Sequence, residues 1–340
     1  MNDQSRTDAW SHYWSLGHTT SLPDLFPANY SGGISAFWND AFASLKDDSR
    51  VLDICTGNGA IALLAWDFAQ SKGIRCDIHA IDAARITPSI SERSNTAPAP
   101  VIFHSRVPVE GTPFSNRSFD LIVGQFALEY CNAVESIREL ARIIKPDGAL
   151  VLMLHHSDSP TVRSTHEFIT IGDTLFDKLN IPFRLRRYAQ RYSRHKRKTS
   201  RNIAHKQQQL ESSINKARDL LKQFPDNRLL QSIIQNIENT VARIHNERID
   251  HTATIREFEK KLRFHLMRSK DLRDAALDGL EMYELQGLLL RNGFPRILCQ
   301  PFHLDGTVFS WTLKAWPARI DEAPPSPSPP STSMSGRNCS

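Results

Sequence analysis

The sequence has no long apolar run, no cysteine pattern and no leader-like amino terminus. Apolar runs such as residues 149–154 fall far short of the roughly 20 residues that a membrane-spanning helix needs. The start of the chain lacks the basic-then-apolar order of a secretion signal. The five cysteines are odd in number and irregularly spaced, which favours reduced thiols, and no Cys/His spacing indicates zinc. We therefore expect a cytoplasmic protein without a membrane span or a metal site.

Acidic residues are missing from one segment. Residues 178–206 hold eleven lysines and arginines and no aspartate or glutamate, although the whole chain has a formal net charge of only +5. Tyr188 and Tyr192 are interleaved with these cations at helical spacing. Two interpretations stay open for residues 184–201: a solvated helix face, or a surface for an anionic partner such as RNA, phospholipid or a phosphorylated substrate.

The most informative stretch reads as a strand, a glycine turn and a helix. Residues 50–54 are mostly apolar, the run breaks at Gly57 and Gly59, and apolar residues from Ile61 to Phe68 then recur at helical spacing. Glycines suit such a turn because they adopt positive φ and let the backbone approach a ligand. The helix that follows presents unpaired N–H groups and the positive end of its dipole to that ligand.

Two acidic residues strengthen this interpretation. Asp53 lies at the end of the first strand, and Asp82 ends the next predicted strand, residues 76–82. An acid at the end of the second strand can accept hydrogen bonds from both ribose hydroxyls of a nucleoside. The pattern therefore predicts a nucleoside-binding α/β domain.

Further residues are expected at the same edge of the sheet. A predicted strand from Asp120 ends at Gln125 and Phe126, which should border a ligand because open α/β sheets bind ligands at the carboxyl ends of their strands. The strand 149–154 is followed by His155 and His156, which alternation places on opposite faces. One histidine is a candidate base toward an acceptor, and the other is then structural.

Residues 1–46 are rich in aromatic side chains. They either pack on the sheet or form a lid over the site. In the second case Tyr13 and Tyr30 are candidates for contact with a bound cation, and Tyr13 is a weak catalytic candidate.

Several of these segments resemble the class I S-adenosylmethionine-dependent methyltransferases. The family's first motif is similar to residues 53–59, although the family has Gly where this chain has Cys55. Residues 113–120 and 141–150 resemble two further passages of the family in the correct order. The resemblance implies a doubly wound, mostly parallel, seven-stranded Rossmann-like sheet in the order 3-2-1-4-5-7-6, with strand 7 antiparallel. It also implies S-adenosylmethionine as cofactor.

The resemblance assigns roles in cofactor binding to individual residues. Backbone groups of the turn would hold the amino-acid part of the cofactor, Asp53 would orient the turn, and Asp82 would bind the ribose. Ala83 would contact adenine, and Gln125 and Phe126 would border the methyl group. The family's adenine-binding acid is replaced here by Pro108, so Glu110 or a backbone carbonyl would take over. The turn residues concerned are Thr56, Gly57, Asn58 and Gly59.

The family pattern is interrupted after His156 and returns near residue 280. We therefore divide the chain into an N-terminal lid, a methyltransferase domain, a helical insertion and a disordered tail. Within the insertion, heptad spacing from Ile203 to Phe224, followed by a Pro-Asp turn and a second amphipathic helix, predicts an antiparallel helical hairpin. The hairpin is a spacer, a cover for the site or a homodimer contact. The divisions are 1–46, 47–156 with 280–317, 157–279 and 318–340.

The expected function is methyl transfer from S-adenosylmethionine to an O, N or C nucleophile of a small-molecule acceptor. An RNA or protein methyltransferase that uses the basic insertion is the first alternative. A non-catalytic scaffold that dimerises through the hairpin is the second.

Overall fold

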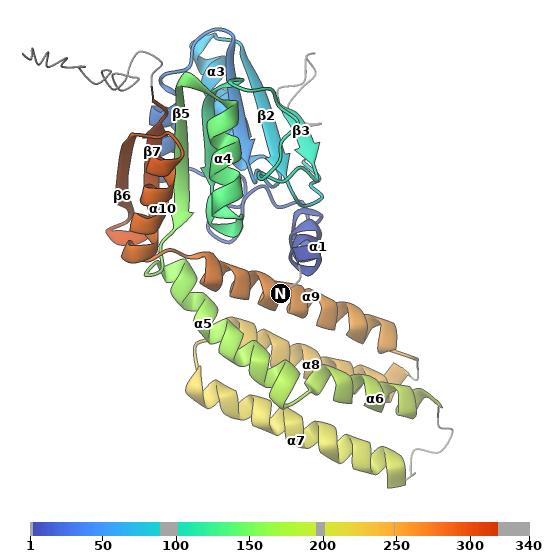
Figure 1. Cartoon of the computed structure of the whole chain (residues 1–340). Coiled ribbons are helices and arrows are strands. Elements are labelled where there is room, and N and C mark those ends of the chain that lie inside the picture. Colours follow the sequence, from blue (N-terminus) through green and yellow to red (C-terminus); the bar gives the residue numbers. More distant parts are fainter. Residues whose placement is uncertain (1–2, 89–100, 195–200, 248, 319–340) are drawn as a thin grey trace, which may run out of the picture.

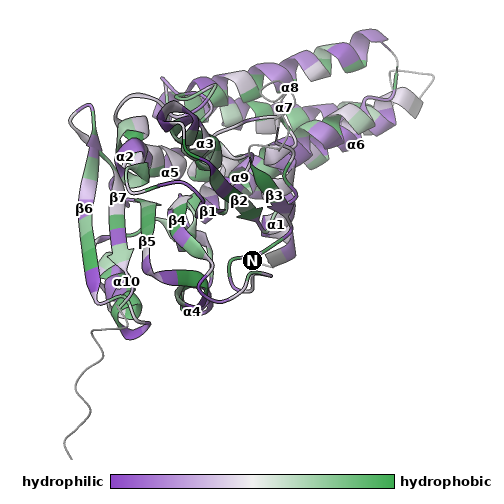
Figure 2. Ribbon diagram, turned by 90° about the horizontal axis from the view of Figure 1, so that it is seen from above, coloured by the Kyte–Doolittle hydropathy of each residue, from purple (hydrophilic) through white to green (hydrophobic). Residues whose placement is uncertain are grey.

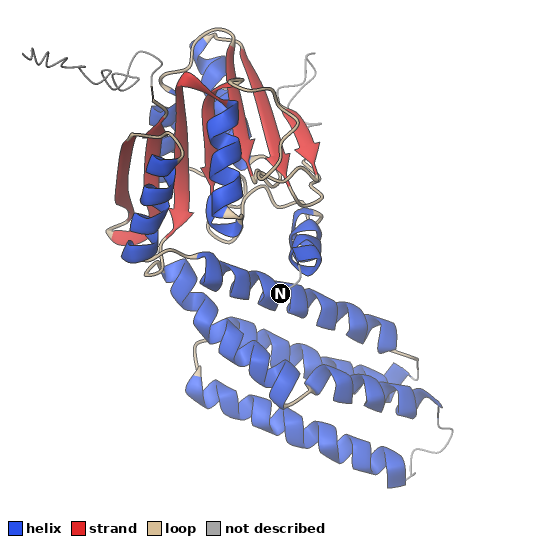
Figure 3. Ribbon diagram, in the orientation of Figure 1, coloured by secondary structure: helices blue, strands red, loops and turns tan. Residues whose placement is uncertain are grey.

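The computed structural model describes residues 3–88, 101–194, 201–247 and 249–318. A sheet with helices on both faces forms one body, and a bundle of helices lies beside one end of it (Figures 1 and 3). The tail from residue 319 and residues 195–200 of the basic segment lie outside the described residues. The predictions made for those two segments therefore stay predictions.

The seven strands form one sheet in the order β3-β2-β1-β4-β5-β7-β6. Strands β1 to β5 are parallel to one another, and β7 runs antiparallel to both β5 and β6. This result confirms the predicted strand order and the antiparallel seventh strand. The bounds are β1 Ser49–Ile54, β2 Cys76–Asp82, β3 Ile102–Ser105, β4 Phe119–Gln125, β5 Ile144–His155, β6 Arg296–Leu304 and β7 Thr307–Trp316.

Helices cover both faces of the sheet, which leaves the strand ends for ligands. On one face α2 (Gly32–Phe42) and α3 (Ala60–Lys72) share an apolar cluster with Val51. On the other face α4 (Ala133–Ile143) and α10 (Gly279–Arg291) pack with Leu52 and Ile54. Because β1 is apolar on both faces, it lies in the middle of the sheet as a fully buried parallel strand.

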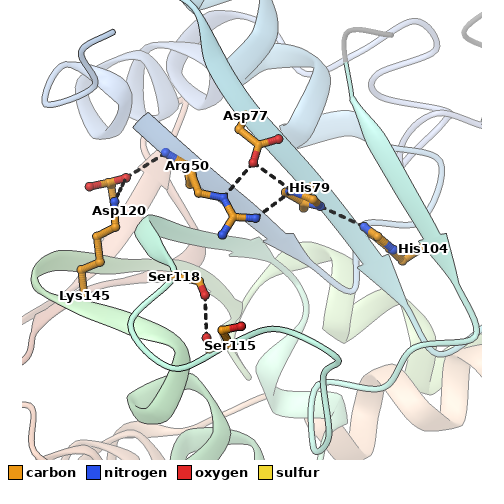
Figure 4. Close-up of polar contacts among 8 residues, drawn as sticks. All are labelled: Arg50, Asp77, His79, His104, Ser115, Ser118, Asp120 and Lys145. Atoms are coloured by element: carbon orange, nitrogen blue, oxygen red, sulfur yellow. Dashed lines mark hydrogen bonds and ion pairs between the residues drawn. The ribbon is translucent and has the colours of Figure 1, made fainter. Parts of the chain in front are cut away.

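A polar network crosses the part of the sheet away from these carboxyl ends (Figure 4). Arg50 of β1 pairs with Asp77 of β2 at 2.7 Å and contacts His79 at 3.1 Å. The ring of His79 is in turn 2.9 Å from that of His104 on β3. Asp120 of β4 accepts from the backbone N–H of Arg50 at 2.8 Å. The network links four neighbouring strands and is structural, since partly exposed ion pairs of this kind each contribute little energy.

In the described residues of the insertion five α-helices form a bundle, where the sequence predicted only a hairpin. The predicted pair is present as α7 (Arg201–Gln223) and α8 (Arg228–Glu247), which contact each other. Their apolar stripes are buried in one cluster with residues of the other helices, so they do not face outward as a dimer contact would. Hydrophilic and hydrophobic residues alternate along these helices (Figure 2). The additional helices are α5 Pro160–Asp173, α6 Ile181–Arg194 and α9 Thr252–Ala275.

Helix α9 is dense in charge, and its apolar period is weak. Helix α6 has a clear apolar stripe, but only its basic face was interpreted from the sequence. Apolar residues of these additional helices share one buried cluster with those of α7 and α8. Among the described residues, no helix has the length and apolar character needed to cross a membrane.

Helix α1 (Asp3–Trp14) lies between the sheet and the bundle (Figure 1). Arg6 pairs with Asp271 of α9 at 3.1 Å and donates to the Tyr130 carbonyl at 3.4 Å. The amino-terminal helix therefore ties the end of β4 to the insertion.

Candidate active site

A cavity of about 610 Å³ lies at the carboxyl ends of β1, β2 and β4, and we call it the strand-end cavity. Helix α1 forms part of its wall through two tryptophans. Its volume is in the range of small-molecule and cofactor sites. Among the residues that line it are Trp10, Trp14, Tyr30, Asp53, Cys55, Thr56, Asp82, Ala83, Glu110, Gln125, Phe126, Tyr130 and His155.

The glycine turn is packed so tightly that no side chain fits at either glycine. Gly57 has φ +56° and Gly59 has φ +94°, both in the left-handed region. A Cβ atom at Gly57 would lie 2.4 Å from the ring of Trp14, and one at Gly59 would lie 2.6 Å from Phe103. Trp14 thus covers the turn, and neither glycine is among the residues that line the cavity.

Asn58 anchors the amino-terminal segment to the turn. Its amide nitrogen donates to the carbonyls of Trp14 at 2.9 Å and His18 at 2.8 Å, and its side-chain oxygen accepts from the Thr87 N–H at 2.9 Å. The side chain of Asn58 is therefore used within the protein and is not among those lining the cavity.

Asp53 is buried beneath the turn. One carboxylate oxygen accepts from the Thr56 hydroxyl at 2.5 Å and from the Ala62 N–H at 3.0 Å, which joins the strand, the turn and the first turn of α3. This geometry supports the predicted role of Asp53 in orienting the turn. Burial raises the pKa of Asp53 to about 7 against the opposing effect of these hydrogen bonds.

Asp82 ends β2 with its carboxylate in the strand-end cavity. It accepts from the N–H of Gly57 at 2.8 Å and of Ala84 at 2.7 Å. A carboxylate offers about four acceptor sites, so further sites remain for hydroxyl donors. Burial raises the pKa of Asp82 to about 6. Its place fits the predicted contact with ribose.

The side-chain amide of Gln125 is buried, and its nitrogen has no hydrogen-bond acceptor among the described residues. Its side-chain oxygen accepts from the Trp38 indole at 2.6 Å, while its Nε2 faces the Tyr30 hydroxyl without reaching hydrogen-bond geometry with any described residue. A buried donor without an acceptor costs about 1–3 kcal/mol, which a bound carboxylate would recover. S-adenosylmethionine has both a carboxylate for Gln125 and ribose hydroxyls for Asp82, so the residues present fit the cofactor that the sequence implies.

The residues that the resemblance places near adenine also border the strand-end cavity. Pro108 and Glu110 both line the cavity, and Glu110 accepts from the Asn132 N–H at 2.8 Å with one oxygen. Cys55 adopts φ +48°, which explains why glycine suits this position better. Its sulfur lies 3.6 Å from the sulfur of Cys131.

The three catalytic candidates lie in different places. His155 is buried, lines the strand-end cavity and stacks on Phe126 with ring centres 3.8 Å apart. Burial lowers the pKa of His155 to about 3, so its ring is neutral at physiological pH. His156 stacks on Trp311 and is not among the residues lining the cavity, and the Tyr13 hydroxyl donates to the Thr20 carbonyl at 2.8 Å.

A second cavity of about 1140 Å³ adjoins the first, and we call it the insert cavity. It lies between the amino-terminal segment, α5, α9 and the turn that joins α7 to α8. Trp10, Ser21, Tyr130 and His155 line both cavities, so these four residues form the junction between them. Tyr13 lines the insert cavity only.

Sequence reasoning missed most of the insert cavity. His265 and Arg268 of α9 line it, although they lie more than 100 residues after the strand that carries His155. In the sequence, His265 and Arg268 belong to a helix with interleaved aromatic and basic residues. A helix face that is only solvated can have the same pattern, so the sequence does not indicate a cavity there. Trp10 and Trp14 belong to the aromatic segment that was predicted to form a lid, but their sequence context does not distinguish them from its other aromatic residues.

The buried acids of this site make stability depend on pH. Burial raises the pKa of Asp53, Asp82 and Glu129 to about 7, 6 and 7, above their unfolded values. The folded state then binds more protons between about pH 4 and pH 7, so their stabilising contribution is present at low pH and lost as pH rises through the folded pKa values.

We therefore expect the ionisation of Asp53 to lower the free energy of unfolding of the unliganded protein between pH 5 and pH 7.5, by on the order of 1–3 kcal/mol. Burial lowers the pKa of His155 to about 3, so this histidine acts in the opposite direction below about pH 6.5, as Glu139 does at lower pH with its pKa lowered to about 2. Urea unfolding of the wild type and of Asp53→Asn at several pH values isolates the contribution of Asp53, because the other groups are common to both proteins. The stability difference between the two proteins should change across the interval, and an equal slope in both would contradict the assignment.

Comparisons with known proteins agree with this geometry. A family model described as a methyltransferase domain matches residues 28–210, more than half of the chain. The 2-phytyl-1,4-naphtoquinone methyltransferase of Synechococcus elongatus is 28% identical over 140 residues, which cover 39% of this chain and 59% of that protein. An uncharacterized methyltransferase of Bacillus subtilis, YcgJ, is 27% identical over 141 residues, which cover 41% of this chain and 53% of that protein.

The crystal structure of the Bacillus YcgJ protein superposes with a TM-score of 0.31 at 25% identity and covers 42% of this chain and 58% of that one. The match thus spans between half and three fifths of the length of these relatives. The family match, the predicted strand order and the fit of the cavity to S-adenosylmethionine agree, and the chain belongs to the methyltransferase domain family of S-adenosylmethionine-dependent enzymes.

Proposed function

We propose that the protein transfers the methyl group of S-adenosylmethionine to a small-molecule acceptor that binds in the insert cavity. The observation that carries this proposal is the junction of the two cavities at Trp10, Ser21, Tyr130 and His155. A donor in the strand-end cavity and an acceptor in the insert cavity would meet there. The relative from Synechococcus is named for a small, largely apolar substrate, which supports an acceptor of that size class.

The protein's part in this reaction is mainly alignment. When bound, S-adenosylmethionine supplies an electrophilic methyl group on its sulfonium. Asp82 and the buried amide of Gln125 would fix the donor, and the aromatic walls at the junction would exclude water and orient the acceptor for in-line attack. Trp10 and Tyr130 contact edge to face at 5.8 Å and frame this junction.

His155 is the side chain of the junction best placed to touch the acceptor. Its ring is neutral and stacked on Phe126, so it can exchange a hydrogen bond with an acceptor hydroxyl or amine. A base with so low a pKa removes a proton efficiently only from an acidic group. His155 would therefore orient the acceptor more than deprotonate it.

This role predicts a pH profile. The kcat of the wild type should show no step near pH 6.5 that belongs to His155, because the pKa of its ring is about 3. His155→Gln should lower kcat by about tenfold or more while leaving S-adenosylhomocysteine affinity within a few fold. A step near pH 6.5 that vanishes in His155→Gln would show that the histidine titrates as a base.

The basic segment gives weaker support to an RNA or protein acceptor. Two of its described arginines are engaged within the protein: Arg186 pairs with Glu259, and Arg187 lies over the ring of Phe183. The segment also starts on α6, which forms part of the bundle and lines neither of the two cavities. The scaffold alternative would need an exposed apolar stripe on α7 or α8, whereas these stripes lie in the bundle core.

Methyl transfer can be tested with labelled S-adenosylmethionine and a panel of phenols, amines and carboxylic acids, followed by mass spectrometry of the products. We expect one chemical class to gain a methyl group in proportion to enzyme. Transfer to RNA or protein, with none to small molecules, would favour the macromolecular alternative. Absence of S-adenosylhomocysteine binding in titration calorimetry would contradict the proposal itself.

A further inference from the structure

We propose that the methyl acceptor carries an anionic group, a carboxylate or a phosphate, which Arg268 binds inside the insert cavity. The inference rests on the proposed function and adds the chemical class of the substrate. Its basis is a cation that faces a large cavity with no acidic partner.

Arg268 is held against aromatic rings. Its guanidinium carbon lies 4.6 Å from the ring centre of Tyr13 and 6.0 Å from that of Trp10. The side chain is half-buried, and it donates one hydrogen bond, at 3.3 Å, to Nδ1 of His265. These contacts fix the plane of the guanidinium, but aromatic faces and one long hydrogen bond leave most of its five donors without an acceptor among the residues that the structure describes.

Other cations of the same helix have carboxylate partners. Arg263 pairs with Glu259, Lys270 with Asp173 and Arg273 with Asp274. Within the described residues no carboxylate pairs with Arg268, even though Asp24, Glu167 and Asp226 also line the cavity. Of these acids Glu167 is engaged by the amide of Asn227 at 2.9 Å. Lys261 and Arg228 also line the cavity without a carboxylate partner among the described residues, but Arg268 is the cation that lies against Tyr13 and Trp10 near the junction.

The surroundings of Arg268 make an anionic ligand favourable. Arg268 is half-buried, and burial lowers the pKa of its guanidinium to about 10, so the charge has lost part of its hydration. A cation removed from water is costly until an anion is placed beside it. The planar fork of an arginine matches the two oxygens of a carboxylate or phosphate, and such charge-assisted pairs are among the strongest hydrogen bonds in proteins.

The position of Arg268 also suits an acceptor that reaches the methyl group. Trp10, which lies under the guanidinium, lines both cavities. An acceptor whose acidic group contacts Arg268 can run along the indole toward Tyr130 and His155 at the junction. The anion would thus fix one end of the acceptor while the nucleophile points toward the strand-end cavity.

The test is titration calorimetry of the full chain saturated with S-adenosylhomocysteine. Three probes share one ring system: naphthalene-2-carboxylate, 2-naphthyl phosphate and the neutral 2-naphthylmethanol. We expect at least one anion to bind about tenfold or more tightly than the alcohol, as one charge-assisted hydrogen bond provides. The ratio of the dissociation constants of the carboxylate and the phosphate then shows which anion the site prefers.

Three variants test whether Arg268 causes the preference for the anionic probes. Arg268→Met should remove it, and Lys261→Met, which changes another cation lining the same cavity, should keep it. Arg268→Lys should retain a reduced preference and keeps the test valid if the methionine variant folds poorly.

The proposal is overturned if the alcohol binds as well as the anions, if the preference survives in Arg268→Met, or if neither anion binds at millimolar concentration. A chain that fails to bind S-adenosylhomocysteine would contradict the proposed function separately. In that case the three probes are titrated into the chain without S-adenosylhomocysteine, and the same outcomes decide the proposal.

Discussion

Replacing Asp82 by alanine should weaken S-adenosylhomocysteine binding by about 10- to 100-fold, the largest loss that we expect from a single side chain at this site. The carboxylate lies in the strand-end cavity with acceptor sites left for ribose hydroxyls, and it also holds the N–H of Gly57. Its removal therefore deletes a ligand contact and loosens the turn at the same time. Titration calorimetry gives the affinity, and a thermal melt reports any loss of fold.

Two control variants separate these effects. Asp77→Ala removes a carboxylate from the other end of the same strand, where it pairs with Arg50, and should leave cofactor affinity unchanged. Asp82→Asn keeps an acceptor oxygen but loses the charge, so its affinity should lie between those of the wild type and Asp82→Ala. An Asp82→Ala protein with wild-type affinity would show that the nucleoside does not bind at the tip of β2.

Gly57→Ala should lose both stability and cofactor affinity. The left-handed backbone at Gly57 costs a residue with a Cβ about 1–2 kcal/mol, and the new methyl group would collide with Trp14. Displacing a packed indole costs about 1–3 kcal/mol more and moves a wall of the strand-end cavity. We expect a clear fall in the free energy of unfolding by urea and at least tenfold weaker binding of S-adenosylhomocysteine.

Gly73 provides the matched control. Its φ of +68° is also left-handed, but nothing lies within 4 Å of the place where a Cβ would be. Gly73→Ala should therefore show the backbone cost alone and keep cofactor affinity. If the collision with Trp14 is the cause, adding Trp14→Ala to Gly57→Ala should recover part of the stability, with a coupling of about 0.5–3 kcal/mol. Equal stability losses in Gly57→Ala and Gly73→Ala would contradict the role of Trp14.

Patterns within short segments were enough to predict the sheet and its cofactor end. The apolar run before Gly57, the acids Asp53 and Asp82, and the order of the later segments predicted the seven strands and the edge at which they bind ligands. Such features are local, because the period of a strand, the need for positive φ at a turn and the end of a strand all act over a few residues. The placement of Asp82 and Gln125 in one cavity followed from the parallel topology.

The insertion was predicted only in part, because sequence patterns report local features and not the contacts between distant helices. The heptads of α7 and α8 are a local signal, whereas the charges of α9 obscure its buried stripe. The apolar stripe of α6 is clear in the sequence, but the pattern does not say which helices cover it. The burial of both stripes depends on contacts between helices that are far apart in the chain, and the sequence pattern does not contain those contacts.

The sequence by itself determined a methyltransferase sheet, a glycine turn and the acids beneath and beside it. Only the tertiary structure decided that Trp14 closes on Gly57, that His155 and not His156 lines the strand-end cavity, and that Arg268 has no acidic partner within the described parts of the chain. Each of these facts depends on packing between segments distant in the chain. A cavity and the charge left unpaired inside it are properties of that packing, because they arise from what neighbouring elements fail to fill or neutralise.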